Sequence, residues 1–101
     1  YGHYVIVRYL NETLPTSTRR TLTENGFEGQ HLFVMYAHLL HMFVQTGQSI
    51  DPSTQIATCG DSGNSSGPHL HLEVRAHANA DQTSWAAMRP GLMNPDVLFL
   101  R

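Results

Sequence analysis

Residues 65–75 read Ser65-Ser66-Gly67-Pro68-His69-Leu70-His71-Leu72-Glu73-Val74-Arg75, a glycine and proline turn followed at once by an alternating stretch. Successive side chains of a β-strand point to opposite faces. The polar side chains of this stretch, from the first histidine to the arginine, therefore share one face, and the leucine and valine side chains share the other. The pattern predicts a strand with one polar face and one face toward an apolar core.

The spacing of the two histidines in this strand would let both side chains reach one site. Cα atoms two residues apart on a strand are separated by about 6.5–7 Å, so the imidazoles of His69 and His71 can reach one metal ion or flank one water molecule. Zinc sites use neutral imidazoles that a rigid element holds in place. From the spacing alone, a metal site and a solvated histidine pair are both open.

The composition is that of one compact domain over residues 1–101, with 41% apolar residues and a formal net charge of −2. The six basic residues are all arginines and form no run longer than Arg19-Arg20, which argues against nucleic acid or an anionic membrane as a partner. No apolar run approaches the ~20 residues of a transmembrane segment. Cys59 is the only cysteine, so no intrachain disulfide can form, and we interpret it as a small buried residue.

Two further strands are predicted upstream, over residues 4–9 and 31–39, because both stretches are rich in β-branched and aromatic residues. Between them, residues 11–30 have the composition of a loop with one short ordered turn. Residues 45–57 predict very short strands separated by glycine and proline. With no repeat, heptad pattern or long helix, the chain is predicted to be all-β, a small antiparallel β-sandwich or hammerhead-like domain.

Several motifs together resemble a known family. They are Tyr36-Ala37-His38-Leu39, Val44-Gln45-Thr46-Gly47-Gln48, the block of residues 60–75 and Asn94-Pro95. In this order they resemble the LytM/lysostaphin-type zinc metallopeptidases, which cut peptide cross-links of bacterial peptidoglycan. The resemblance implies a zinc-dependent endopeptidase that binds peptidoglycan peptide stems or cross-bridges, in the bacterial cell envelope (periplasm) or secreted.

The resemblance also implies roles for three histidines. In the family, Zn²⁺ is held by a His and an Asp of an upstream His-x-x-x-Asp motif and by the second histidine of His-x-His, which is His71 here. By the same match, His38 and His69 are catalytic rather than metal-binding. They would flank the zinc-bound water and the scissile carbonyl, as a base or as an electrostatic partner of the oxyanion.

The chain departs from the family at the other two ligands. The only histidines before His38 are His3 and His31, and Val7 and Met35 stand four places after them. No His-x-x-x-Asp motif is therefore present upstream. We expect the chain to be an N-terminally truncated portion of a peptidase domain, inactive by itself because two zinc ligands are missing.

Two stretches, residues 11–30 and 77–93, have no close counterpart in shorter family members. We interpret them as long loop insertions at the walls of the substrate groove, so the substrate-binding residues are unknown. The second contains a predicted helical turn over residues 84–89. It also contains a His-x-x-x-Asp match from His77 to Asp81, which follows the His-x-His strand instead of preceding it, and which we interpret as coincidence between two solvated residues.

Two alternatives to the truncated peptidase are open. The chain could be a degenerate, non-catalytic domain that binds peptidoglycan or activates a partner hydrolase. It could also hold zinc by itself through His38, His69 and His71, since three histidines are a known zinc ligand set. We favour the truncated peptidase because both non-ligand histidines are present. Uncovered sheet edges would favour pairing with a second copy of the chain.

Overall fold

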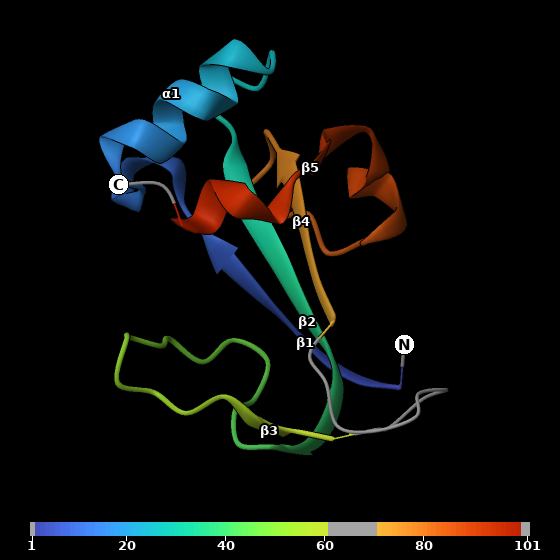
Figure 1. Ribbon diagram of the computed structural model, residues 1–101. Helices are drawn as coiled ribbons and strands as arrows, with labels where there is room; N and C mark the ends of the chain where they lie inside the picture. The colour runs from blue at the N-terminus through green and yellow to red at the C-terminus, as the bar shows by residue number, and fades with distance from the viewer. Residues whose placement is uncertain (1, 61–70, 100–101) are drawn as a thin grey trace. The chain divides into compact units, whose positions relative to one another are not determined.

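The computed structural model describes residues 2–60 and 71–99. Within them the chain forms five strands, which are β1 (His3–Tyr9), β2 (His31–Met42), β3 (Ala57–Cys59), β4 (His71–His77) and β5 (Leu92–Met93). The strands lie in one sheet in the order β1-β2-β4-β5, and β3 pairs with β2 (Figure 1). The pairs β2/β3 and β4/β5 are antiparallel. The prediction of a small all-β fold is confirmed.

The chain divides into two compact units. Unit 1 comprises Tyr1–Val5 and Tyr36–His71, and unit 2 comprises Ile6–Met35 and Leu72–Arg101. Strands β1, β2 and β4 contribute residues to both units. Each unit is described by itself.

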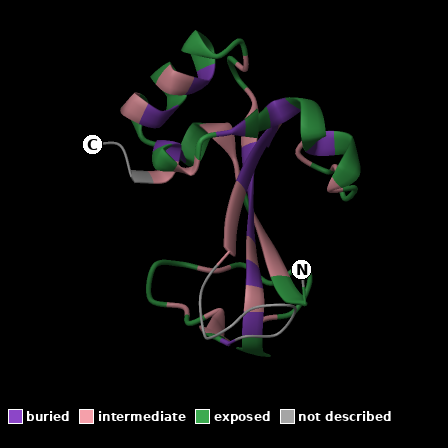
Figure 2. Cartoon of the chain, turned by 45° about the vertical axis from the view of Figure 1, so that its right-hand side comes forward, coloured by how far each residue is buried: buried purple, intermediate pink, exposed green. Residues whose placement is uncertain are grey.

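Unit 2 contains most of the buried apolar side chains among the described residues, from the first helix, β2, β4 and the C-terminal segment (Figure 2). The buried apolar side chains of this unit are those of Leu14, Leu22, Leu32, Phe33, Val34, Met35, Val74, Ala76, Met88, Met93 and Val97. Burial of a leucine or valine side chain contributes about 1.5–3 kcal/mol. This cluster is therefore the main apolar core that the structure describes.

The interpretation of residues 11–30 as a loop with one short turn is wrong in its centre, because Thr16–Glu24 form the α-helix α1. Thr18 and Leu22 are its buried residues, and they stand four places apart on one face. Pro15 is the N-cap, and the helix ends in a Schellman motif, in which Gly26 has φ 84° and the Phe27 amide donates to the Leu22 carbonyl at 2.8 Å. Because only one of these two buried residues is apolar, the helix shows no apolar pattern of period 3.6 that the sequence analysis could detect.

The C-terminal part of unit 2 has short 3₁₀ helices at Ala86–Gly91 and Pro95–Phe99. The first overlaps the helical turn predicted over residues 84–89 and also includes Pro90. The second packs on α1, where the Thr18 hydroxyl donates to the Val97 carbonyl at 3.2 Å.

Unit 1 is held by a strand pair and by turns. Among its described residues 43–56 there is no strand, so the very short strands predicted there are absent before Ala57. Side chains bond the backbone instead: the Gln45 amide donates to Oε1 of Gln48 at 3.1 Å, and the Ser53 amide donates to Oδ1 of Asp51 at 2.8 Å. Such local bonds compete with strand pairing.

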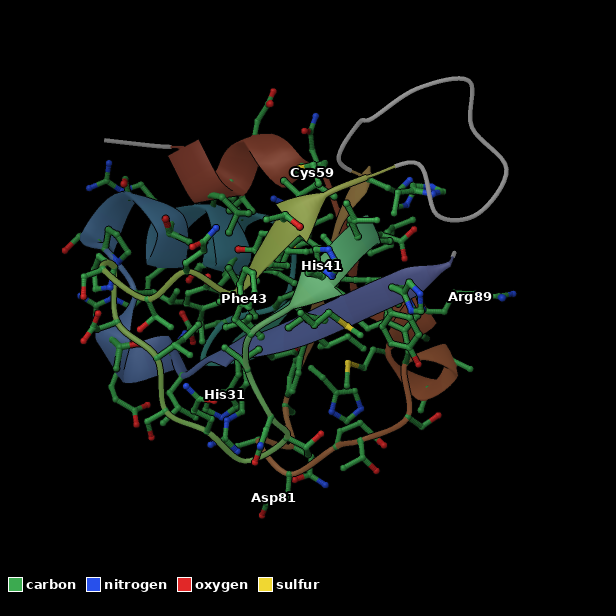
Figure 3. The ribbon with its side chains drawn as sticks, turned by 90° about the horizontal axis from the view of Figure 1, so that it is seen from below. His31, His41, Phe43, Cys59, Asp81 and Arg89 are labelled. Atoms are coloured by element: carbon green, nitrogen blue, oxygen red, sulfur yellow. The ribbon has the colours of Figure 1, made fainter. Side chains whose placement is uncertain are left out.

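The prediction that Cys59 is buried is wrong. Cys59 is exposed, at the end of β3 and opposite Leu39 of β2 (Figure 3). Strand β3 lies off the main strand path and pairs only with β2 among the described strands. Because β3 is short and has one neighbouring strand, Cys59 at its end is accessible to solvent. Residue type alone was therefore not enough to predict whether Cys59 is buried.

Candidate functional site

Unit 1 brings together two of the three predicted site histidines. His38 lies near the end of β2 and His71 begins β4. Their ring centroids are 5.6 Å apart, and the ring planes make an angle of 78°. This is the edge-to-face arrangement and the distance range of a direct ring contact. The two imidazoles can therefore act on one small group between or beside them.

The backbone at His38 is unusual. Its φ is 59°, the only positive φ among the described non-glycine residues. The pairing of β2 with β3 is irregular at the next positions, where the register shifts between Leu39 and His41. A non-glycine residue in the left-handed region is uncommon, and bulges often redirect a side chain beside a functional site. The alternation of β2 is thus interrupted where the histidine contacts its partner.

His71 is half-buried, and its Nε2 atom is shielded from solvent. Imidazole nitrogens are common metal ligands, and His71 is held at the start of β4, so its side chain suits the role of one ligand. Residues 2–60 and 71–99 contain no group of three or more His, Cys, Asp and Glu side chains that could hold a metal ion. The described residues therefore supply one expected ligand and do not complete a set.

His69, the second predicted catalytic histidine, lies outside the described residues. The roles of His38, His69 and His71 stay predictions, as does the three-histidine alternative. His31 has a different place: its Nδ1 accepts a hydrogen bond from the Asn11 amide at 2.9 Å. It belongs to unit 2, where this bond ties the start of β2 to the chain after β1.

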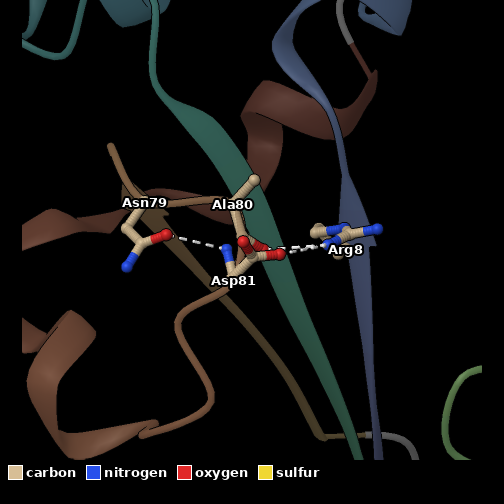
Figure 4. A network of polar contacts seen from close by, with 4 residues as sticks. All are labelled: Arg8, Asn79, Ala80 and Asp81. Atoms are coloured by element: carbon tan, nitrogen blue, oxygen red, sulfur yellow. Dashed lines mark hydrogen bonds and ion pairs between the residues drawn. The ribbon is translucent and has the colours of Figure 1, made fainter.

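The His-x-x-x-Asp match from His77 to Asp81 has other partners. Nδ1 of His77 accepts a hydrogen bond from the Asn79 amide at 3.0 Å. Asp81 lies 3.7 Å from the Arg8 guanidinium, which also donates to the Ala80 carbonyl at 3.0 Å (Figure 4). These two residues are not part of any metal-binding group among the described side chains.

A buried polar cluster in unit 2 was missed by the sequence analysis. Arg75 is only 6% exposed, although it was assigned to a polar face. Its guanidinium lies 2.8 Å from the Glu73 carboxylate and 4.4 Å above the Trp85 ring, and it donates to the Trp85 carbonyl at 2.6 Å. The Trp85 indole N–H donates to the same carboxylate at 3.0 Å. The polar face of β4 is thus covered by the segment that was interpreted as an insertion.

The two segments without a counterpart in shorter family members meet in unit 2. They line a pocket of about 220 Å³ whose walls include Phe27 and Gln30 from the first segment and His77, Ala87 and Pro90 from the second. Whether they form the walls of a substrate groove stays a prediction. No helix in the described part of the chain is long and apolar enough to cross a membrane.

Comparison with known proteins adds the decisive observation. The sequence profile described as peptidase family M23 matches residues 21–83, more than half of the chain. The chain belongs to peptidase family M23. The match covers all three predicted site histidines, and the resemblance to the LytM/lysostaphin-type peptidases is confirmed.

One curated relative of this M23 chain is an uncharacterized metalloprotease of Haemophilus influenzae, with 36% identity over 52 residues. The aligned part is 52% of this chain and 11% of the relative. The chain thus spans about a tenth of the length of that protein. No solved structure gives a significant match to the chain. The description of this relative as a metalloprotease agrees with the assignment of the chain to a peptidase family.

Proposed function

We propose that the chain is part of a zinc-dependent endopeptidase that hydrolyses the peptide cross-links of bacterial peptidoglycan. The observation that carries the proposal is the ring contact of His38 with His71, at 5.6 Å, in a chain of the M23 family. By the resemblance to the LytM/lysostaphin-type peptidases, His71 is proposed as a zinc ligand and His38 as a catalytic histidine. The zinc, the substrate and an envelope or secreted location rest on the resemblance.

The proposed roles follow from the chemistry of imidazole. When bound, zinc polarises a carbonyl and lowers the pKa of a water molecule to about 7. His71 would supply one ligand nitrogen. His38 and His69 would accept or hold a proton, or donate a hydrogen bond to the oxyanion. No His-x-x-x-Asp pair precedes His38 in this sequence, so activity is proposed for a longer protein that carries such a pair upstream.

The test compares three histidine variants of that longer protein. His71→Ala should abolish both stoichiometric zinc, measured by elemental analysis, and the release of cross-link peptides from peptidoglycan. His38→Ala should retain zinc and lose about 10²–10⁴-fold in rate, the usual contribution of a general acid or base. His77→Ala is the matched control, because this histidine is on the same strand as His71 and is bonded to Asn79; it should change neither measurement.

Full activity with bound zinc after His71→Ala would refute the ligand assignment. The degenerate-domain alternative predicts that the protein is retained by intact peptidoglycan in the presence of chelator and releases no peptide. For the 101-residue chain alone, we expect no stoichiometric zinc and no hydrolysis. One tightly bound zinc equivalent would instead support the ligand set of His38, His69 and His71.

A further inference from the structure

We propose that Gly60 is a positioning residue that sets the backbone of His38 and thereby its ring contact with His71. That this contact matters for catalysis rests on the proposed function. The effect of Gly60 on the His38 backbone does not depend on it. All three residues belong to unit 1. Gly60 follows β3 directly and is buried.

A hydrogen bond joins Gly60 to the unusual residue. The Gly60 amide donates to the His38 carbonyl at 3.0 Å. This bond fixes the peptide plane that leaves His38, whose φ of 59° is the left-handed value. Positive φ is uncommon for any residue other than glycine, and such a conformation persists where neighbouring contacts determine it. The amide of Gly60 is one such contact.

Gly60 is also placed where no side chain has room. A Cβ atom at this position would lie 2.7 Å from the Leu40 Cβ, 3.1 Å from its Cα and 3.2 Å from its amide nitrogen. Leu40 stands between the two positions at which the β2/β3 register shifts. A side chain on residue 60 therefore displaces the backbone of the bulge itself, two residues after His38.

The requirement for glycine is one of space and not of backbone conformation. Gly60 is not among the described glycines with positive φ. Gly47 shows the opposite case, with φ 89° and no atom within 4 Å of a built Cβ. Removing the obstructing atom of Leu40 should therefore restore tolerance of alanine at position 60, which a conformational requirement would not allow.

The experiment follows the His38 and His71 ring protons by NMR in the 101-residue chain. The wild type should show a ring-to-ring cross-peak, as the 5.6 Å centroid distance requires. Gly60→Ala should lose that cross-peak, while the Trp85 indole N–H resonance, which reports the bond to Glu73 in unit 2, is retained. A wild type without the cross-peak, or a Gly60→Ala chain that keeps it unchanged, would overturn the proposal.

Rescue distinguishes positioning from general damage, including the case in which Gly60→Ala does not fold. The double variant Gly60→Ala with Leu40→Gly removes the closest clash and should regain the cross-peak. The matched variant Gly60→Ala with Leu40→Ala keeps the Leu40 Cβ and should not. Leu40 is 53% exposed, so its side chain is dispensable to the core. Equal behaviour of the two double variants would refute the steric mechanism.

Discussion

The two units of the chain differ in how their residues are used. Unit 2 has eleven of the thirteen buried apolar side chains among the described residues, while unit 1 has Ala37 and Leu39. Of the five large apolar side chains that are exposed in residues 2–60 and 71–99, four are in unit 1, at Tyr4, Leu40, Met42 and Phe43. The candidate histidine pair is in the unit with little core. Elements that bind or react are commonly drawn from the less stable part of a fold.

The most buried ion pair of the described residues follows the same division. In unit 2, Arg75 and Glu73 form an ion pair whose side chains are 8% and 21% exposed, and Trp85 covers it. In unit 1, Asp51 is bonded to Ser53 in an exposed turn. The difference indicates that unit 2 supplies most of the free energy of unfolding. Unit 1 holds the strained backbone and the predicted site, and the predictions below test this division.

The largest effect is expected from the core of unit 2. Leu22→Ala removes a side chain that is 0% exposed and should lower the free energy of unfolding by about 2–5 kcal/mol, the usual loss of transfer energy plus the cost of the cavity. Leu40→Ala, the matched leucine of unit 1, is 53% exposed and should change it by less than about 0.5 kcal/mol. Urea denaturation followed by Trp85 fluorescence measures both. Equal losses would contradict the division.

Much of the fold could be predicted from the sequence because its strands have strong local signals. The β-branched and aromatic runs placed β1 and the start of β2 correctly, and alternation placed β4. Alternation cannot reveal what covers a face, so the burial of Arg75 by Trp85 was not foreseen. Helix α1 was missed although Pro15 and the turn at Gly26 mark its two ends, because it presents few apolar residues.

The candidate site was predicted from the family resemblance and not from local sequence patterns. The association of His38 with His71 came from the family resemblance and not from spacing, because the residues are on different strands. Neither source predicted that His38 would have a positive φ or that Gly60 would contact its carbonyl. A bulge depends on the register in which two strands pair. The sequence pattern predicts where each strand lies but not the register of the pair.

The second prediction compares two ion pairs of unit 2. Glu73→Ala leaves the Arg75 guanidinium buried without its carboxylate and removes the acceptor of the Trp85 indole. We expect a loss of about 1–3 kcal/mol in the free energy of unfolding, because the guanidinium and the indole N–H are left without this acceptor in a buried position. Asp81→Ala breaks the pair with Arg8, in which the aspartate side chain is 93% exposed, and should cost less than about 1 kcal/mol. Chemical denaturation of both variants measures the two losses. A larger loss of free energy of unfolding for Asp81→Ala than for Glu73→Ala would refute the view that the buried pair contributes more to stability.

The smallest effect is expected at Asp51 of unit 1. A hydrogen bond from the Ser53 hydroxyl, followed by one from the Ser53 amide, lowers the pKa of the Asp51 carboxyl below its ordinary value, with weaker help from Thr54. Because the pKa is lower in the folded turn, the turn is stabilised above the ordinary pKa of an aspartate and loses this contribution as the pH falls through the lowered value. NMR titration of the Asp51 carboxyl should show the depression, and Ser53→Ala should remove most of it. An unchanged pKa in Ser53→Ala would show that the bond from the Ser53 hydroxyl does not form in solution.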